Sequence, residues 1–179
     1  MIFKIKYFKK LPSTNSYLLK RAAKSKENLV IVADYQTQGR GKPGREWLSP
    51  AGKNLLFSLL LKPQTAPSKA PLLTQIASRS VAAVLKDHGI DSKFKRPNDI
   101  LVNGQKICGI LVETGTFGSK LEYVVLGIGL NVNASPSEFN GQATCMKAIL
   151  GLNFGIRTIL YEVLCQLGKD LGPFNAHCP

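Results

Sequence analysis

The sequence has 179 residues, of which 44% are hydrophobic, and its formal net charge at neutral pH is +13. This length suffices for one well-packed domain and is short for two. No stretch is long and apolar enough to suggest a membrane span, and the amino-terminal segment lacks the apolar core of a signal peptide. The four cysteines are scattered without C-x-x-C spacing, which argues against zinc and disulfides. We therefore expect a reduced, cytoplasmic protein.

The large positive charge predicts attraction to a polyanion, which can be nucleic acid, an anionic membrane surface or an acidic protein. Composition alone does not choose among these partners. Many of the lysines outside motifs are equally well explained as solvated surface.

The first part of the chain alternates strand and loop signals. Residues 1–10 alternate apolar and cationic side chains, as a half-buried strand does, and Ser13 or Thr14 can cap a helix over about 14–25. Residues 29–35 are rich in β-branched side chains and predict a strand. A glycine-rich loop then leads to a partner strand with the sequence NLLFSLLLK.

The second part contains the clearest helix, over 71–89, where apolar residues recur at helical spacing. A strand, a Pro-Asn-Asp turn and a short strand follow, and Asn103-Gly104 predicts a type I′ hairpin leading into a strand over 107–113. LEYVVLGIGLNVN predicts another strand, 155–171 a helix, and the last residues a frayed end. We expect a single α+β domain over 1–179 with a mixed, mostly antiparallel sheet and helices packed on one side, because strands and helices do not alternate regularly.

The segment TQGRGKPGREW contains the G-x-G-x-x-G spacing of a dinucleotide-binding turn, but a Rossmann fold is excluded. No helix signal follows the third glycine, and no acidic residue occurs between Glu46 and Asp87 to hold a ribose. Three cations stand among the glycines and can bind a phosphate-bearing ligand beneath a closing loop: Arg40, Lys42 and Arg45. A solvated basic turn is the alternative.

Two further segments favour an anionic ligand. In KRPNDILVNGQKICGILVE, Lys95 and Lys106 can reach one anion from neighbouring strands, and Asn98 or Asp99 can assist a Mg²⁺ ion or orient a lysine. In LGIGLNVN, the two glycines lie on one face of a strand and, together with Gly109, allow a flat ligand to approach bare backbone. The two histidines, His88 and His177, are interpreted as structural or exposed, so no Ser/His/Asp triad is predicted.

Five motifs together resemble the catalytic domain of biotin protein ligase, also called biotin–[acetyl-CoA-carboxylase] ligase. They are STN at 13–15, YQTQGRGKPGREW at 35–47, KRPND at 95–99, KICGILVE at 106–113 and LGIGLNVN at 126–133. The resemblance implies the fold shared with class II aminoacyl-tRNA synthetases. It also implies an ATP-dependent reaction, with Mg²⁺, that forms biotinyl-5′-AMP and transfers biotin to a lysine of biotin carboxyl carrier protein.

The resemblance further implies roles for individual residues and assigns no metal ligand among them. The essential lysine that bridges the biotin carboxylate and the α-phosphate corresponds to Lys106, with Arg40 and Lys95 as further catalytic cations. Biotin contacts are expected from Ser13, Thr14, Asn15, Gln36, Arg40, Gly41, Lys42, Lys106, Gly109, Leu111, Gly127 and Gly129. Contacts to ATP and the adenylate are expected from Arg40, Lys42, Arg45, Trp47, Lys95, Asn98 and Asn131, with Trp47 as a hydrophobic cover.

The chain departs from the family pattern in several places. The usual KWPND reads KRPND, so Arg96 replaces an aromatic residue, and Lys42-Pro43 stands where two arginines are common. We expect neither an amino-terminal helix-turn-helix domain nor a carboxy-terminal β-barrel. An acidic carrier protein is the expected partner, without nucleic acid or membrane, and a homodimer is left open. Two rival functions are a lipoate or octanoate ligase or transferase and a basic nucleic-acid-binding module.

Overall fold

The computed structural model describes residues 1–176 except for residues 64, 119 and 140. Its described strands form one seven-stranded sheet. Across the sheet the order is β1 (Lys4–Leu11), β2 (Leu29–Gln36), β3 (Leu55–Leu61), β7 (Lys120–Leu130), β6 (Gln105–Phe117), β5 (Asp99–Val102) and β4 (Lys93–Lys95). Only the β1–β2 pair is parallel among these neighbours. The expected α+β class with a mostly antiparallel sheet is confirmed.

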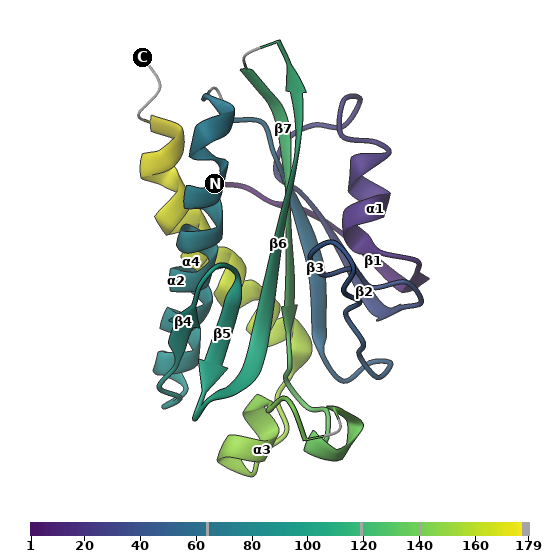
Figure 1. Ribbon diagram of the computed structural model, residues 1–179, viewed down its shortest axis with the longest axis vertical. Helices are drawn as coiled ribbons and strands as arrows, with labels where there is room; N and C mark the ends of the chain where they lie inside the picture. Colours follow the sequence, from purple (N-terminus) through teal and green to yellow (C-terminus); the bar gives the residue numbers. More distant parts are fainter. Residues whose placement is uncertain (64, 119, 140, 177–179) are drawn as a thin grey trace.

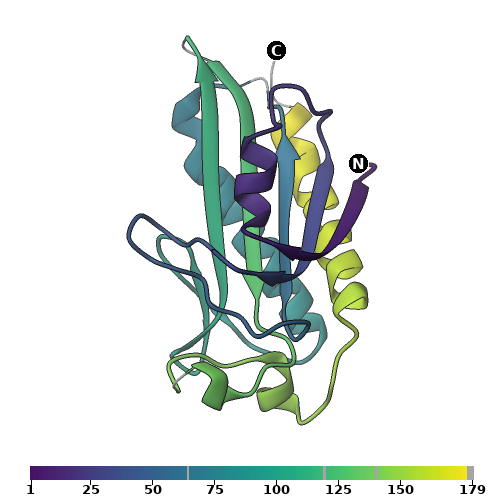
Figure 2. The ribbon, with the colours of Figure 1, turned by 90° about the vertical axis from the view of Figure 1, so that its right-hand side faces the viewer.

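The helices lie on both faces of this sheet (Figures 1 and 2). The long helices α2 (Ala70–Asp87) and α4 (Ile156–Ala176) pack together on one face, as expected. The short helix α1 (Thr14–Leu19) packs against β2, β3 and β7 on the opposite face. The expectation of helices on one side therefore holds for the two long helices. Helix α1 covers part of the opposite face, which is also the face that carries the site.

Strand β3 is buried on both faces, because each face is covered by a different helix layer. Leu55, Phe57 and Leu59 belong to the main core beneath α2 and α4. Leu60 belongs to a smaller cluster beneath α1, and Ser58 makes polar contacts with that helix. This two-sided burial explains why the strand reads as a continuous apolar run instead of an alternating one.

Several boundaries differ from the sequence predictions. The first helix ends at Leu19, not near 25, because the following backbone forms tight turns, with Arg21 N bonding to Leu18 O and Lys24 N to Arg21 O. The last helix continues to Ala176, beyond the predicted 171, and His177 lies outside the described residues. The helix predicted over 71–89 matches α2 within two residues at each end.

The hairpin of β6 and β7 is longer than predicted and projects beyond the rest of the sheet (Figure 1). The segment after Glu113 continues as strand, and Gly115 lies against the ring of Tyr123, which leaves no room for a side chain there. The predicted type I′ turn is confirmed, since Asn103 has φ of 49° and Gly104 has φ of 81°. Three short helices were not predicted: Pro67–Lys69, Pro136–Phe139 and α3 (Met146–Leu150). None of the described helices is long and apolar enough to span a membrane.

Candidate functional site

Three adjacent strands form a floor on the α1 face of the sheet, with glycines at three of its positions. The register places Leu56 of β3, Gly129 of β7 and Gly109 of β6 in one row across the sheet. The next row contains Ser58, Gly127 and Leu111. The two β7 glycines lie on one face, as predicted, and Gly109 extends the bare backbone onto the neighbouring strand.

A buried polar cluster lies at the Gly127 end of this floor. Ser13 caps α1 through the N–H of Ser16, which places Thr14 and Asn15 at the start of the helix. The backbone N–H and hydroxyl of Thr14 donate to Gln36 Oε1 at 2.7 and 3.0 Å. Ser58 Oγ lies 2.7 Å from Thr14 Oγ1 and donates to Asn15 Oδ1 at 2.5 Å. These buried hydroxyl and amide groups can recognise a compact polar head group.

A carboxylate connects this cluster to the glycine-rich loop. Glu113 Oε2 accepts hydrogen bonds from Asn15 Nδ2 at 2.8 Å and from Arg40 Nη2 at 2.6 Å. Asn15 Nδ2 also lies 3.4 Å from the carbonyl oxygen of Leu111. One acidic side chain on β6 therefore holds a residue of α1 and a residue of the loop.

At the Gly109 end of the floor, the ammonium group of Lys106 pairs with Asp99 Oδ1 at 2.7 Å. A Cβ atom placed on Gly109 would lie 3.2 Å from Lys106 Nζ, so this cation lies directly over the floor. Lys106 Nζ is also 5.2 Å from the centre of the Trp47 ring. Beneath it, burial raises the pKa of the Cys108 thiol and the charge of Lys106 opposes that shift, so Cys108 is a protonated core residue and not a nucleophile.

The indole of Trp47 covers the floor between these two ends. Cβ atoms placed on Gly109 and Gly129 would approach the Trp47 ring to 2.6 and 2.5 Å. Its Nε1 is buried without a hydrogen-bond partner among the described residues. The cavity left between floor and cover has a volume of only about 30 Å³. It is lined by Ser13, Thr14, Asn15, Gln36, Arg40, Trp47, Leu56, Phe57, Gly109, Leu111, Gly127, Ile128 and Gly129.

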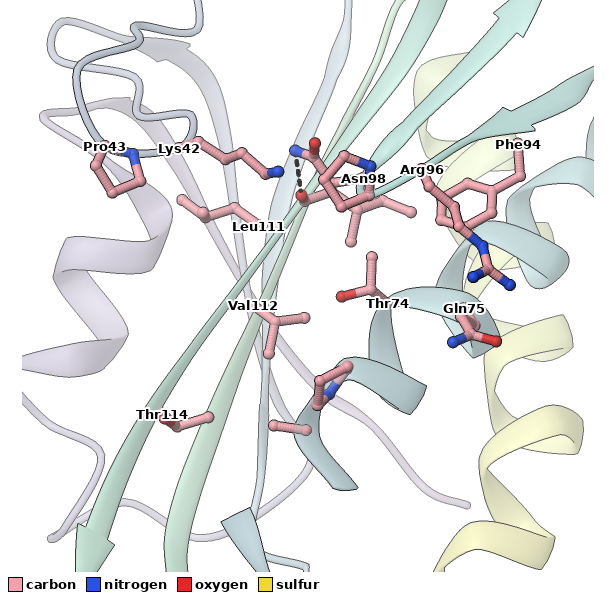
Figure 3. Close-up of a pocket in the computed structure, with 14 residues that line it drawn as sticks. Lys42, Pro43, Thr74, Gln75, Phe94, Arg96, Asn98, Leu111, Val112 and Thr114 are labelled. Carbon is pink, nitrogen blue, oxygen red and sulfur yellow. Dashed lines mark hydrogen bonds between the residues drawn. The ribbon is translucent and has the colours of Figure 1, made fainter. Parts of the chain in front are cut away.

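A larger cavity of about 460 Å³ opens beside the first and shares Leu111 with it. Figure 3 shows Lys42 extending from the loop toward Asn98, whose Nδ2 donates to the carbonyl oxygen of Ile110 at 3.0 Å. Arg96 stands on the other side, beside Phe94 and Gln75. Among the described residues that line this cavity, none is acidic, so its charged lining is entirely cationic.

Several predicted residues lie outside both cavities. Lys95 is exposed on β4, and β5 separates its strand from that of Lys106, so the expectation that these lysines lie on neighbouring strands is wrong. The predicted strands were correct, but their order across the sheet depends on hairpin pairing. Arg45 is exposed, and its backbone pairs with that of Gly41 inside the loop. Asn131 is buried after β7, where Nδ2 donates to Thr144 O at 3.0 Å.

Two residues of the site were not singled out from the sequence. Ser58 is fully buried in β3, and the signal available in the sequence was a single polar residue inside the apolar run LLFSLLL. Glu113 closes the KICGILVE motif as an acid after an apolar run. His88 pairs with Glu162 at 2.7 Å at a helix end, in agreement with a structural role. In the described part of the chain, no group of three or more His, Cys, Asp or Glu side chains is arranged to hold a metal ion.

Comparison with known sequences identifies the family. Residues 7–131 match the model of the Biotin/lipoate A/B protein ligase family. The bifunctional ligase/repressor BirA of Bacillus subtilis is 41% identical over 156 residues, which cover 84% of this chain and 48% of that protein. The biotin–[acetyl-CoA-carboxylase] ligase of Mycobacterium tuberculosis is 35% identical over 141 residues, covering 75% and 51%. The chain thus spans about half the length of these curated relatives.

Solved structures of biotin protein ligases resemble the whole fold. The biotin protein ligase of Aquifex aeolicus, in complex with biotin and ATP, superimposes with a TM-score of 0.81 at 29% identity, covering 97% of this chain and 72% of that one. The biotin acetyl coenzyme A carboxylase synthetase of Helicobacter pylori, with bound biotinylated ATP, has a TM-score of 0.72 at 28% identity, covering 95% and 76%. The matched family model spans most of the chain and contains the glycine floor, the loop and Lys106. The chain therefore belongs to the biotin/lipoate A/B protein ligase family.

Proposed function

We propose that the chain is an ATP-dependent biotin–[acetyl-CoA-carboxylase] ligase. In this proposal it activates biotin as biotinyl-5′-AMP and transfers the biotinyl group to a lysine of biotin carboxyl carrier protein. The observation that carries the proposal is the glycine floor with a buried polar cluster at one end and the ammonium group of Lys106 at the other. Such a pocket suits a flat polar ring joined by an apolar chain to a carboxylate.

The electrostatics of the site support the first step. A carboxylate and a polyphosphate repel each other, so they react only where cations hold both of them. A carboxylate oxygen of biotin attacks the α-phosphorus, the bond from that phosphorus to the bridging oxygen breaks, and pyrophosphate leaves. Lys106 is positioned by Asp99 at 2.7 Å and can neutralise the two reacting anions together. Lys42, in the cavity that also contains Asn98, can contact the phosphates of the nucleotide.

In the second step, the neutral amine of a carrier lysine attacks the acyl carbon of the mixed anhydride. The bond to the phosphate oxygen breaks, AMP leaves, and the nitrogen loses its extra proton. The net charge of +13 supports an acidic carrier protein as the acceptor. We propose this carrier as the protein partner, in the cytoplasm. A homodimer stays a prediction that sedimentation velocity would test.

The polar cluster favours biotin over lipoate, which is the nearest rival substrate. A ureido ring offers donors and an acceptor that can pair with the buried Ser13 and Thr14 and with the partly buried Gln36. A dithiolane or a linear acyl chain lacks these donors and this acceptor, so it would add no hydrogen bonds to the polar cluster.

Mg²⁺ is proposed to enter as part of the nucleotide, bound to the phosphate oxygens of Mg-ATP. The residues near Lys106 suit this arrangement, because Mg²⁺ bound with substrate phosphates needs only one or two protein oxygen ligands. Asp99 offers a carboxylate and Asn98 an amide oxygen. Arg45 and Asn131 remain proposed nucleotide contacts that would require movement of the loop and of the segment after β7, respectively. Lys95 remains a proposed contact from β4.

Biotin-dependent exchange of radiolabelled pyrophosphate into ATP tests this function with the purified chain. We expect exchange with biotin and not with lipoate, and biotinyl-5′-AMP detectable by mass spectrometry. Lipoate-dependent exchange would instead support the rival enzyme. Absence of exchange with either acid, combined with tight DNA binding, would favour the nucleic-acid-binding module.

A further inference from the structure

Arg40, the first cation of the glycine-rich loop, is already neutralised by a fixed carboxylate. Its Nη2 lies 2.6 Å from Glu113 Oε2, a short distance typical of a charge-assisted hydrogen bond. The Glu113 side chain is only 26% exposed, so solvent screens this pair less than it screens a surface pair. An arginine held in this way is not free to bind phosphate.

The other loop cations differ from Arg40 in this respect. Among the described residues, no carboxylate lies within ion-pair distance of Lys42 or Arg45. Lys42 also lines the larger cavity, whose described charged residues are all cations. The loop therefore contains one anchored cation and two available ones.

Glu113 also fixes the polar end of the pocket. The same Oε2 atom accepts from Asn15 Nδ2 at 2.8 Å, and Asn15 in turn accepts from Ser58. Glu113 belongs to β6 and pairs with Val125 in the long β6–β7 ladder, so its backbone position is fixed by sheet pairing. The glycine-rich loop and the polar cluster thus share one anchor on a paired strand.

Anchoring Arg40 also positions the cover of the pocket. Arg40 pairs as an isolated bridge with Glu46, and Trp47 N donates to Gly39 O at 2.9 Å, so the two sides of the loop move together. A glycine-rich loop loses much conformational entropy when it is ordered, which makes such an anchor necessary.

We propose that Glu113 is a positioning residue that fastens the glycine-rich loop through Arg40, so that Arg40 closes the polar end of the pocket while Lys42 and Arg45 receive phosphate. This proposal deepens the proposed function and rests on it. It replaces the direct phosphate contact that the sequence suggested for Arg40. It assigns Glu113 a role in the affinity for biotin and not in the chemical step.

The test compares Glu113→Gln, Arg40→Gln and the double variant. Glu113→Gln keeps the shape and an oxygen acceptor for Asn15 but removes the charge. Arg40→Gln changes an exposed loop residue and leaves the buried core intact. It therefore tests the same contact even if Glu113→Gln disturbs folding. Glu162→Gln is the matched control, because Glu162 makes a 2.7 Å pair with His88 and is 38% exposed, away from the site.

The first readout is the fluorescence of Trp47, which is the single tryptophan of the chain. Both single variants should shift its emission to longer wavelength and raise acrylamide quenching by about twofold, because a released loop exposes the indole. The Glu162→Gln control should match the wild type. Unchanged emission in both single variants would overturn the proposal, whether or not the chain is a ligase.

The second readout separates binding from chemistry. We expect the Kd for biotin, measured by calorimetry, to rise about fivefold to tenfold in each single variant, and no further in the double variant. The rate of adenylate formation at saturating biotin and ATP should change by less than about twofold. The charge-reversed pair Arg40→Glu with Glu113→Arg should recover part of the affinity.

Other results would contradict the role proposed for Glu113 or the proposed function. A saturated rate that falls about tenfold or more in Arg40→Gln but not in Glu113→Gln would mean that Arg40 acts on the phosphate. Independent effects that multiply in the double variant would mean that the two residues do not act as a pair. A wild-type chain that forms no adenylate would refute the proposed function, while the Trp47 readout would still decide whether Glu113 fastens the loop.

Discussion

Gly127 and Gly129 are two residues apart on one strand, yet each is required by a different neighbour. A Cβ on Gly127 would come within 2.2 Å of Asn15 Oδ1, whereas a Cβ on Gly129 would meet the indole of Trp47. Asn15 is buried and bonded to Ser58 and Glu113, so it has little room to retreat. Trp47 belongs to the loop and can move away.

Gly127→Ala should therefore damage both stability and binding. We expect a loss of about 1–3 kcal/mol in the free energy of unfolding, because the added methyl group displaces a buried, hydrogen-bonded amide. Urea denaturation measures this loss, and calorimetry should detect much weaker biotin binding. Gly168→Ala is the control: Gly168 lies in α4, an added Cβ would meet its nearest neighbour at 3.6 Å, and the change should not destabilise the chain. A Gly127→Ala variant as stable as the wild type would contradict the packing.

Lys106→Ala should strongly reduce the rate of adenylate formation. Removing a positioned charge that stabilises the reacting phosphoryl group costs about 10²–10³ in rate. Lys106→Arg should not restore the rate, since a planar guanidinium does not reproduce the ammonium geometry held by Asp99. Quenched-flow measurement of biotinyl-5′-AMP gives the rate, with Lys120→Ala as a control on the far end of the hairpin. Full adenylation by Lys106→Ala would remove this lysine from the mechanism.

At the scale of elements, the loop between β2 and β3 controls access to the pocket. With Trp47 on the glycine floor the cavity holds only about 30 Å³, far below the roughly 300–1,000 Å³ of pockets that enclose small molecules. Substrate must therefore displace the indole before it can lie on the glycines, and we expect the Trp47 side chain to swing away while the Arg40–Glu113 contact stays in place. The strands beneath remain in place, because their backbone pairing is continuous through β3, β7 and β6.

Biotin alone should therefore change the environment of Trp47. We expect a saturable change in its emission as biotin is added without ATP, because the indole exchanges contact with Gly109 and Gly129 for contact with the ligand. Lipoate at the same concentration should leave the emission unchanged. An emission that stays constant while calorimetry reports bound biotin would mean that the indole is not displaced.

The helices and strands also show where local sequence signals succeed. The 71–89 helix and the Asn103-Gly104 turn were predicted well because helical periodicity and a positive φ at two residues are local properties. The order of β4, β5 and β6 was partly missed, because pairing across hairpins decides which strands are neighbours. The continuation of β6 beyond Glu113 was missed because Gly115 reads as a turn residue until Tyr123 is seen to cover it.

At the scale of the whole molecule, the positive charge is unevenly distributed. Residues 1–26 contain seven lysines and one arginine and no acidic residue. Four of these lysines are exposed on β1, at the edge of the sheet: Lys4, Lys6, Lys9 and Lys10. The chain continues from β1 directly into the Ser13–Asn15 segment, so this basic surface adjoins the polar end of the pocket.

The transfer step should consequently depend on salt more strongly than the activation step. Raising the ionic strength from about 10 mM to about 150 mM shortens the Debye length from roughly 30 Å to roughly 8 Å and screens the attraction of an acidic carrier. We expect the second-order rate of carrier biotinylation to fall several-fold, while adenylate formation at saturating substrates changes little. Rates of both steps that respond equally to salt would argue against electrostatic steering.

The sequence by itself determined the fold class, the family resemblance and most residues of the pocket, because the glycines, the STN segment and Lys106 belong to short local motifs that can be read along the chain. Only the tertiary structure decided which cations are available. Arg40 and Glu113 are separated by 73 residues along the chain, and their 2.6 Å contact exists because the loop folds back over β6. Lys95 was assigned to the site by its motif, yet β5 separates its strand from that of Lys106. Charge is a property of each residue, whereas pairing depends on distances that only the packed sheet and loop establish.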